Sequence, residues 1–400
     1  MKKQSNAPHL RFQNYEDEWY VEKLKNIFGT IRNAFVGTAT PYYVENGNFY
    51  LESNNVKNGK INYNSQIFIN DEFYEKQRDK WLKTNDIVMV QSGHVGHTAV
   101  IPEELNNTAA HALIVFTDYK KEVNPYFLNY QFQSNSKMKA LDLISTGNTI
   151  KHILASEMKN FKMDFPTSEE QSAIGSLFRT LDDLLASYKD NLANYQSLKA
   201  SMLSKMFPKV GQTVPEIRLD GFEGEWENKI LSEVTNITMG QSPKSENYTD
   251  NPNDYILVQG NADIKDKQVV PRLWTTEVTK MAEIGDIILT VRAPVGDIGK
   301  TDFNVVIGRG VAAIKGNDFI FYTLEKMKMT GFWNRFSTGS TFESISSNDI
   351  KEAIIQLPTL EEQQAIGAYF SNLDNLIAAH QDKISQLEIL KKKLLQDMFI

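Results

Sequence analysis

Residues 167–208 read TSEEQSAIGSLFRTLDDLLASYKDNLANYQSLKASMLSKMFP, and residues 359–400 read TLEEQQAIGAYFSNLDNLIAAHQDKISQLEILKKKLLQDMFI. The two stretches align without a gap at a constant offset of 192 residues, and about two in five of their positions are identical. Repetition over this length indicates that the chain consists of two similar halves, each of which ends in the same element.

Each copy of the repeat is predicted to form one long helix. Thr167 and Thr359 are suitable N-caps, and a glutamate (Glu170 or Glu362) follows three residues later, as in a capping box. Neither copy contains an internal proline. With a rise of about 1.5 Å per residue, a helix of roughly 40 residues spans about 60 Å.

Apolar residues recur in both copies at alternating spacings of three and four, which is the pattern of a heptad seam. Because one helix cannot bury such a seam alone, we expect the two helices to pair, in antiparallel orientation. Asn191, His380 and Lys383 interrupt the seam, either to fix its register or as ordinary surface residues. The residues expected at the helix-pair interface are Ile174, Leu177, Leu181, Leu184, Tyr188, Tyr195 and Leu198 in the first copy, and Ile366, Tyr369, Leu373, Leu376, Leu387 and Leu390 in the second.

The segments that precede the two helices are related more loosely. Arg11 and Trp19 correspond to Arg218 and Trp226, and residues 145–147 have the same sequence as residues 337–339. Short β-branched runs predict strands at residues 86–90, 113–116, 286–291 and 305–307. Asn124 and Asn317 are expected to cap further helices.

These patterns predict a mixed α/β (α+β) protein with a pseudo-two-fold internal repeat, in which two long antiparallel coiled-coil helices separate two globular domains. The expected boundaries are a first globular domain at residues 1–166, a central long helix at 167–208, a second globular domain at 209–358 and a C-terminal long helix at 359–400.

The composition of the 400-residue chain excludes several classes. Cysteine is absent, which excludes disulfides and thiolate metal sites and fits a reducing cytoplasm. No apolar run is long enough to cross a bilayer and no signal peptide is recognisable, so we expect a cytoplasmic protein without membrane association.

The layout resembles the specificity subunits of type I restriction-modification systems. The motif P-T-x-E-E-Q-x-A-I-G introduces both helices, at residues 166–175 and 358–367, and the resemblance covers the whole chain. It implies that each globular domain is a target-recognition domain that reads one half of a split double-stranded DNA site. The paired helices would fix the gap and dock two modification subunits, while restriction (translocase) subunits complete the complex. S-adenosylmethionine, ATP and Mg would belong to those partners.

No pattern in the chain indicates catalysis of its own. The string at residues 299–301 resembles the end of a phosphate-binding P-loop, but Pro294 stands where the loop requires glycine. Residues 124–127 and 251–255 resemble the N-P-P-Y/F motif of adenine methyltransferases without its second proline. We therefore predict no catalytic residue, no metal site and no cofactor in this chain. A standalone DNA methyltransferase or nuclease, and a coiled-coil scaffold without a nucleic-acid role, are the alternatives.

Candidate DNA contacts lie in loops. Arg292 follows a predicted buried strand and suits guanine, whereas Lys300 suits a phosphate. His94 and His97 lack a third ligand for zinc, so a polar DNA-facing or ordinary exposed loop is the better interpretation. The predicted DNA contacts are Gln91, Ser92, His94, His97, Thr146, Asn148, Gln241, Lys244, Arg292, Lys300, Thr338 and Ser340. For each of them the alternative is a solvated surface position.

Geometry and charge add two expectations. Half-sites on one side of B-DNA lie about 34–36 Å apart, which favours a bipartite target with an unread gap and two unlike halves. The net charge of −7 requires either a local concentration of basic residues or positive surface on the partner subunits. Apolar residues off the seam could contact those subunits or pack on the chain's own domains; they are Phe178, Leu185, Leu192, Phe370 and Ile377.

Overall fold

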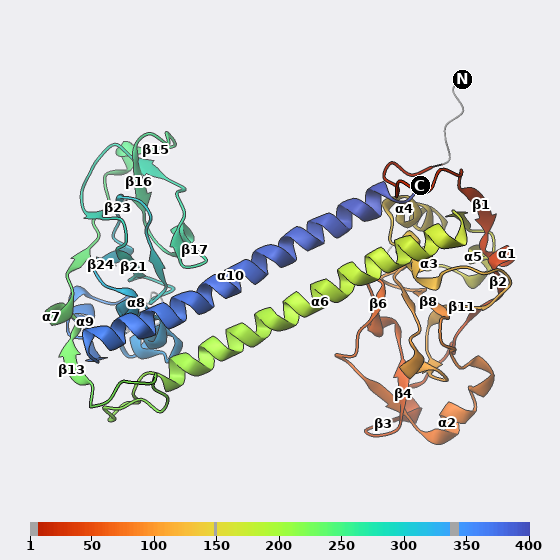
Figure 1. Cartoon of the computed structure of the whole chain (residues 1–400), viewed down its shortest axis with the longest axis horizontal. Helices are drawn as coiled ribbons and strands as arrows, with labels where there is room; N and C mark the ends of the chain where they lie inside the picture. Colours follow the sequence, from red (N-terminus) through yellow and green to blue (C-terminus); the bar gives the residue numbers. More distant parts are fainter. Residues whose placement is uncertain (1–6, 148–149, 337–343) are drawn as a thin grey trace. The chain divides into compact units, whose positions relative to one another are not determined.

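The computed structural model describes residues 7–147, 150–336 and 344–400 (Figure 1). The chain divides into two compact units. Unit 1 comprises Met1–Lys189 and Asp382–Ile400, and unit 2 comprises Asp190–Gln381. Each unit therefore holds one globular domain together with a stretch of both long helices.

The two repeats form the helices α6 (Ser168–Lys205) and α10 (Leu360–Asp397), each 38 residues long. The hydroxyl of Thr167 accepts a hydrogen bond from the backbone N–H of Glu170 at 3.4 Å, and Thr359 does the same for Glu362 at 3.3 Å. The predicted helices and their threonine caps are thus confirmed. Within the described residues, no helix is both long and apolar enough to span a membrane.

The capping glutamates have a role that differs from the expected capping box. Arg11 donates from Nε and Nη2 to the two carboxylate oxygens of Glu170, both at 2.7 Å. Arg218 makes the same two-bonded contact with Glu362, at 2.8 and 2.7 Å. Both carboxylates are fully buried, where a charge requires a paired cation. These glutamates therefore fasten the segment before each domain to the start of its long helix.

Stretches of α6 and α10 run antiparallel within each unit. In unit 1, Lys391 donates to Asp182 and Lys189 donates to Glu388, both at 2.6 Å, so the numbers rise along one helix as they fall along the other. In unit 2, Lys199 donates to Asp374 at 2.6 Å and the ring of Tyr195 lies 5.1 Å from that of His380, which gives the same opposite numbering. The predicted antiparallel pairing is confirmed within each unit.

The globular domain of unit 1 is built on two four-stranded sheets, in the orders β2-β11-β8-β9 and β10-β4-β7-β3. The strands of the first, which are antiparallel throughout, are β2 (Phe28–Asn33), β11 (Leu113–Tyr119), β8 (Ile87–Val90) and β9 (Thr98–Val100). Those of the second are β10 (Ala109–Ala110), β4 (Asn48–Leu51), β7 (Ile67–Ile69) and β3 (Tyr43–Val44). Two ribbons pair β1 (Tyr20–Lys23) with β12 (Lys162–Phe165) and β5 (Val56–Lys57) with β6 (Lys60–Ile61).

The short helices of unit 1 are α1 (Leu24–Ile27), α2 (Asp71–Glu75), α3 (Pro125–Phe132), α4 (Asn135–Ile144) and α5 (Ala155–Met158). As predicted, the side chain of Asn124 caps α3 by accepting hydrogen bonds from the backbone N–H groups of Tyr126 and Phe127, both at 3.0 Å.

Unit 2 has a six-stranded sheet in the order β14-β24-β21-β22-β18-β17 and a five-stranded sheet in the order β15-β19-β16-β23-β20. The strands of the first are β14 (Ile237–Met239), β24 (Val311–Ile314), β21 (Ile287–Thr290), β22 (Ile298–Lys300), β18 (Gln268–Val269) and β17 (Ile264–Lys265). Those of the second are β15 (Tyr248–Thr249), β19 (Trp274–Thr275), β16 (Tyr255–Val258), β23 (Val305–Ile307) and β20 (Met281–Ala282). The ribbon of β13 (Glu227–Ile230) with β25 (Ile354–Leu357) and the helices α7 (Leu231–Val234), α8 (Asp318–Met329) and α9 (Ser347–Lys351) complete the unit.

An aromatic cluster joins the helices to the domain in each unit. In unit 1, the ring of Phe399 at the end of α10 lies 5.6 Å from Phe127 and 5.7 Å from Phe178. In unit 2, Phe207 at the end of α6 lies 5.4 Å from Phe319 and 6.0 Å from Phe370. The end of each long helix is therefore part of the core of the unit that contains the start of the other.

Candidate nucleic-acid interface

In each unit, three loops lie together at one edge of the main sheet. In unit 1, β2 and β8 both pair antiparallel with β11, so the segments that follow them lie beside the segment that enters β11. In unit 2, β14 and β21 both pair antiparallel with β24, so the segments that follow them lie beside the segment that enters β24. We call these segments the loop edge; they are residues 34–39, 91–97 and 110–112 in unit 1 and residues 240–244, 291–297 and 308–310 in unit 2.

Backbone hydrogen bonds fix the loop edge of unit 2. The N–H of Val291 donates to the carbonyl of Gly310 at 2.9 Å, which extends the pairing of β21 with β24. The hydroxyl of Ser242 accepts from the N–H of Arg309 at 3.1 Å and so joins the first segment to the third. Gln241, a predicted contact, is exposed in the first segment.

The segment that carries Arg292 is braced from within. The hydroxyl of Thr290 donates to the carbonyl of Pro294 at 2.7 Å and accepts from the N–H of Asp297 at 2.8 Å. Arg292 is exposed and forms an isolated antiparallel bridge with Ser344. Because this turn is rigid, little backbone conformational entropy is lost when its guanidinium group binds a ligand.

Gly96 and Gly296 explain why this turn recurs in both halves. Their φ angles are +86° and +87°, a region that L side chains rarely adopt. A Cβ at Gly296 would also lie 2.6 Å from the ring of Trp333. The turn is therefore a fixed backbone shape on which the neighbouring side chains can differ.

The predicted contacts of unit 1 meet at the equivalent place. The N–H of Ile153 donates to the carbonyl of Gln91 at 2.9 Å. Ser92 and Thr146 both form bridges with His152, so two loops that are far apart in the sequence lie side by side.

The two histidines of this loop have different surroundings. His94 is exposed, whereas Nδ1 of the half-buried His97 accepts a hydrogen bond from the N–H of Asn58 at 3.3 Å. Burial, with smaller contributions from His94 and Lys57, lowers the pKa of His97, so this ring is neutral near pH 7.

A second polar cluster lies at the loop edge of unit 1. Nδ1 of His111 lies 3.2 Å from the carboxylate of Glu52, and Nε2 lies 3.0 Å from the carbonyl of Gly37. The hydroxyl of Tyr43 donates to the same carboxylate at 2.5 Å. Since both ring nitrogens face acceptors, the protonated form is favoured; the hydrogen bond to Glu52 raises the pKa of His111 above 6.5.

Among the remaining predicted contacts, Lys300 lies apart from the loop edge, Lys244 is the last residue of its first segment, and three fall outside the described residues. Lys300 pairs with Ile287 at the opposite end of β21, so the fold does not bring it to Arg292. Its ammonium group forms an ion pair with Asp318 and lies 5.5 Å from the ring of Phe321. Lys244 is 74% exposed, 3.7 Å from Glu246. Asn148, Thr338 and Ser340 lie outside the residues that the structure describes.

The structure divides the predicted helix-pair residues into three groups. Ile174, Leu181, Ile366, Leu373 and Leu387 are buried. Leu177, Tyr188, Tyr195 and Tyr369 are partly buried. Leu184, Leu198, Leu376 and Leu390 keep 38–43% of their surface exposed.

The expected heptad seam differs from the observed one because each helix turns a face to its own domain as well as to its partner. Phe178, Leu185 and Phe370, which were candidates for partner contact, are buried within their own units. For Phe178, whose ring lies 4.9 Å from that of Tyr130, and Phe370, whose ring lies 5.1 Å from that of Tyr322, packing on the chain's own domain is the correct interpretation.

Sequence patterns did not single out Arg309. It is an exposed arginine between Gly308 and Gly310, immediately before β24. A charged residue between two glycines at the start of a buried strand is the local signal that could have indicated it.

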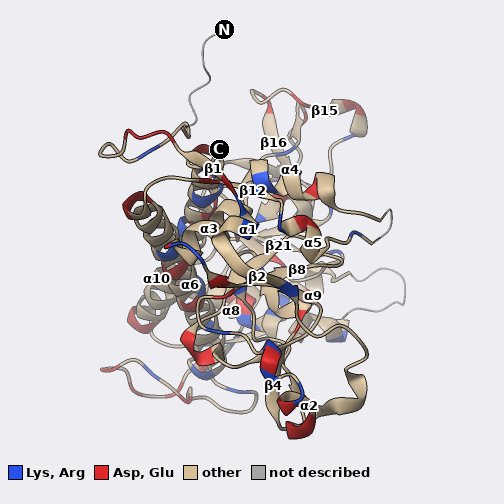
Figure 2. Cartoon of the chain, turned by 90° about the vertical axis from the view of Figure 1, so that its right-hand side faces the viewer, with Lys and Arg blue, Asp and Glu red and all other residues tan. Residues whose placement is uncertain are grey.

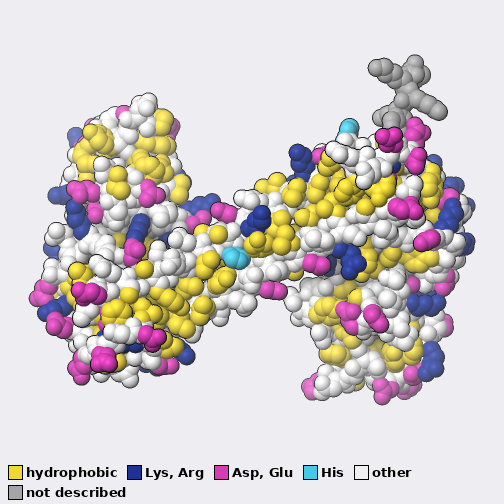
Figure 3. Space-filling model, viewed as in Figure 1, with side chains coloured by type: hydrophobic (Ala, Val, Ile, Leu, Met, Phe, Trp, Pro, Cys, Tyr) yellow, Lys and Arg dark blue, Asp and Glu magenta, His cyan; other side chains and the backbone are white. Residues whose placement is uncertain are grey.

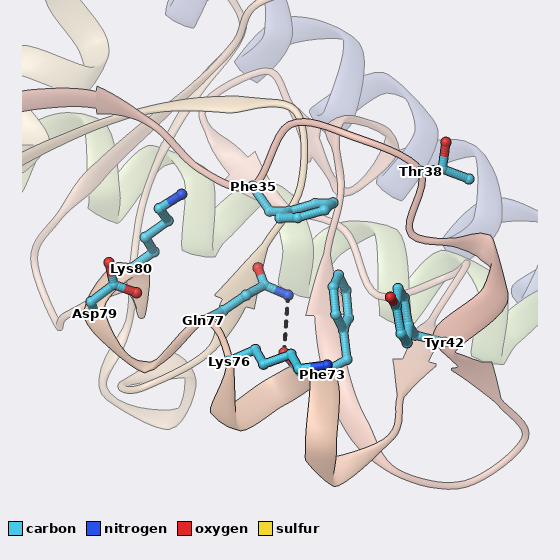
Figure 4. A pocket seen from close by; sticks show the side chains of 8 residues that line it. All are labelled: Phe35, Thr38, Tyr42, Phe73, Lys76, Gln77, Asp79 and Lys80. Carbon is cyan, nitrogen blue, oxygen red and sulfur yellow. Dashed lines mark hydrogen bonds between the residues drawn. The ribbon is translucent and has the colours of Figure 1, made fainter.

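A hollow of about 380 Å³ opens beside the first segment of the loop edge in unit 1 (Figure 4). Tyr42 and Phe73 stack on its wall with ring centroids 4.0 Å apart. The amide of the buried Gln77 donates to the carbonyl of Phe73 at 3.4 Å. Its lining also includes Phe35, Thr38, Lys76, Asp79 and Lys80. The rings mainly brace residues 34–39 against the second sheet.

A family model described as the type I restriction modification DNA specificity domain matches residues 16–217 and 223–389. The chain belongs to this family. It is the DNA-recognition subunit of a type I restriction-modification system. Along 98% of its length it is 27% identical to the MjaX type I specificity subunit of Methanocaldococcus jannaschii, of which it covers 95%. It is 24% identical to the EcoBI specificity subunit of Escherichia coli over 50% of the chain and 44% of that subunit.

Solved specificity subunits share the fold. The type I S subunit of M. genitalium matches with a TM-score of 0.66 at 16% identity, over 98% of this chain and 99% of that one. The HsdS subunit of Thermoanaerobacter tengcongensis matches with a TM-score of 0.50 at 24% identity, over 95% and 96% of the two chains. The expected fold class, two recognition domains with a pair of long helices, is confirmed.

Proposed function

We propose that each unit of this specificity subunit reads one half of a bipartite double-stranded DNA target through its loop edge. The observation that carries the proposal is that both units build the same loop edge on the same sheet framework but place different side chains there. Gln91, Ser92 and His94 occupy unit 1, while Gln241 and Arg292 occupy unit 2. Unlike side chains on a shared framework would read unlike half-sites.

Charge supports a need for partner subunits. Lys and Arg are interspersed with Asp and Glu along the chain (Figure 2), and the net charge is −7. Since phosphate neutralisation supplies most non-specific affinity for DNA, additional positive surface has to come from elsewhere. We assign that surface to the modification subunits of the complex.

The exposed leucines of the helix pair support two equivalent docking sites. Leu184 and Leu390 fall between the ion pairs of Asp182 and Lys189 in unit 1, so they lie at one level of the antiparallel helices. Leu198 and Leu376 occupy the corresponding level in unit 2, between the contacts of Lys199 with Asp374 and of Tyr195 with His380. Hydrophobic side chains also gather over the helices on the face shown in Figure 3. One modification subunit on each leucine pair gives a complex with two of them.

The chemistry of the complex would belong to the partners. Modification subunits would bring S-adenosylmethionine, and restriction subunits would bring ATP and Mg. This chain would select the sequence at which they act, and its two helices, which contribute residues to both units, would set the gap between the half-sites.

The test is methylome sequencing of a host that expresses the modification subunits with and without this chain. We expect methylation at one bipartite motif only when the chain is present. Footprinting of the purified complex on that motif should protect both halves. Methylation by the chain alone would instead support a standalone methyltransferase, and an unchanged methylome with no footprint would support a scaffold.

A further inference from the structure

Two exposed arginines lie on neighbouring segments of the loop edge in unit 2. The pairing of β21 with β24 sets Thr290 opposite Val311, and the hydrogen bond from Val291 to Gly310 continues that register by one residue. Arg292 and Arg309 each lie one residue beyond this hydrogen bond, on the two segments that it joins. Because arginine side chains are long, two that start from segments joined in this way can reach one small area.

Arg309 is held as firmly as Arg292. A Cβ at Gly310 would lie 2.0 Å from the carbonyl oxygen of Gln259, so the backbone of the turn is packed directly on that strand end. The N–H of Gly308 donates to the carbonyl of Val258 at 2.8 Å, and that of Arg309 donates to Ser242. Both sides of the turn are anchored, which fixes where the arginine side chain begins.

The remaining arginines of unit 2 are occupied within the unit: Arg218 by Glu362, Arg272 by Asp263 and Arg335 by the ring of Phe332. Among the described residues, neither Arg292 nor Arg309 has an ion-pair partner within 4 Å. Two like charges on neighbouring segments repel one another, and an electron-rich ligand that covers both would relieve this repulsion.

We propose that Arg309 is a base-reading residue beside Arg292, and that the half-site read by unit 2 carries two guanines, one for each arginine. The inference rests on the proposed function. Arginine binds the O6 and N7 acceptors of guanine with two hydrogen bonds, and guanidinium groups one strand apart can serve neighbouring or next-neighbouring base pairs.

Unit 1 lacks this pair and provides an internal contrast. The corresponding segments of unit 1 carry Ser92 and His111, which form bridges with His152 and Phe35, respectively. His111 is engaged by Glu52 and by the carbonyl of Gly37. The half-site read by unit 1 therefore should not contain the guanine pair.

The test uses the full complex with its modification subunits and compares the methylomes of Arg292→Ala, Arg309→Ala and wild type. Each variant should lose its preference for guanine at one position by about 5- to 150-fold, the discrimination that one bidentate contact supplies. The two positions should differ, belong to the same half-site and leave the other half unchanged. Lys315→Ala is the matched control, because Lys315 follows the far end of β24 and forms only an exposed ion pair with Glu283.

A second measurement changes the DNA, and its first arm uses only the wild-type protein. Duplexes carry 7-deazaguanine at each guanine of the half-site, which removes the N7 acceptor. At one position this change should weaken binding by wild type severalfold but should not weaken binding by Arg309→Ala any further.

Three results would overturn the assignment of Arg309. These are a half-site of unit 2 without guanines, an unchanged methylome of Arg309→Ala, or a uniform loss of affinity with a smaller salt dependence, which is the signature of a phosphate contact. A wild-type complex that methylates no bipartite motif would refute the proposed function itself. That outcome differs from the three above, which refute only the role of Arg309.

Discussion

Asp182 is the residue at which both long helices and the globular domain of unit 1 meet. Its carboxylate accepts from Lys391 on α10 at 2.6 Å and from the hydroxyl of Tyr130 on α3 at 2.8 Å, and Lys60 lies 3.9 Å away. Asp374 repeats this arrangement in unit 2 with Lys199, Tyr322 and Lys267. Replacing Asp182 by asparagine removes the charge and leaves the volume nearly unchanged.

The expected cost follows from burial. The side chains of Asp182 and Lys391 are only 6% and 14% exposed, so water cannot replace the lost carboxylate. Removing one partner of a buried pair costs about 3–5 kcal/mol, because the other charge stays buried. The ammonium group of Lys391 also lies 5.4 Å from the ring of Tyr130, which partly compensates it. We therefore expect a loss of about 3 kcal/mol, at the lower end of that range.

Hydrogen exchange of the full chain, followed by mass spectrometry, measures this effect unit by unit. A loss of about 3 kcal/mol corresponds to exchange faster by roughly 150-fold in the stretches of α6 and α10 that belong to unit 1. Peptides of unit 2 should keep their rates. Asp183→Asn is the matched control, since Asp183 is the exposed neighbour on the same helix and should change stability by less than about 0.5 kcal/mol.

Two results would refute this reasoning. One is an exchange rate in unit 1 that changes less than about threefold in Asp182→Asn, which corresponds to under 1 kcal/mol. The other is an equal effect of Asp183→Asn. Adding Lys391→Met to Asp182→Asn should restore part of the protection, because the uncompensated charge is then removed.

Two further predictions concern the helix pair and the polar cluster of unit 1. Leu184→Glu and Leu376→Glu should each reduce the number of bound modification subunits from two to one, as measured by the mass of the purified complex; burying an apolar side chain of this size contributes about 1.5–3 kcal/mol. Ala186→Glu changes a residue on the opposite face of α6, so this control variant should bind both modification subunits. Leucine variants that still bind two modification subunits would argue against these docking sites. For His111, the pKa is raised above 6.5, so its stabilising contact with Glu52 is fully present below pH 6.5 and is lost as the pH rises through the raised value. The stability difference between wild type and Glu52→Gln should therefore shrink above neutral pH, and an NMR titration that places the pKa of His111 at or below 6.5 would contradict this account.

Local signals in the sequence were sufficient for several features. The threonine caps of α6 and α10 and the asparagine cap of α3 depend on contacts within one turn of the chain, so residue type and spacing predict them. The strands β8, β11, β21 and β23 follow from short buried β-branched runs. The repeat itself predicted two equivalent halves.

Long-range contacts were not predictable in the same way. Glu170 has the spacing of a capping box, but the partner of its side chain is Arg11, which the fold brings from the segment before the domain. The heptad pattern also predicted leucines such as Leu184 in the seam, although the helix turns Phe178 and Leu185 inward. Periodicity identifies an apolar helix but cannot divide its surface between two packing partners.

The sequence by itself determined that the chain has two like halves, each with a mixed α/β domain and a long capped helix, because these features depend on neighbouring residues and on repetition. The tertiary structure alone decided that Arg309 lies beside Arg292 and that His111 meets Glu52. The pairing of β24 with β21 creates the first contact and the pairing of β10 with β4 creates the second; strand pairing is set by packing over the whole sheet rather than by the residues on either side.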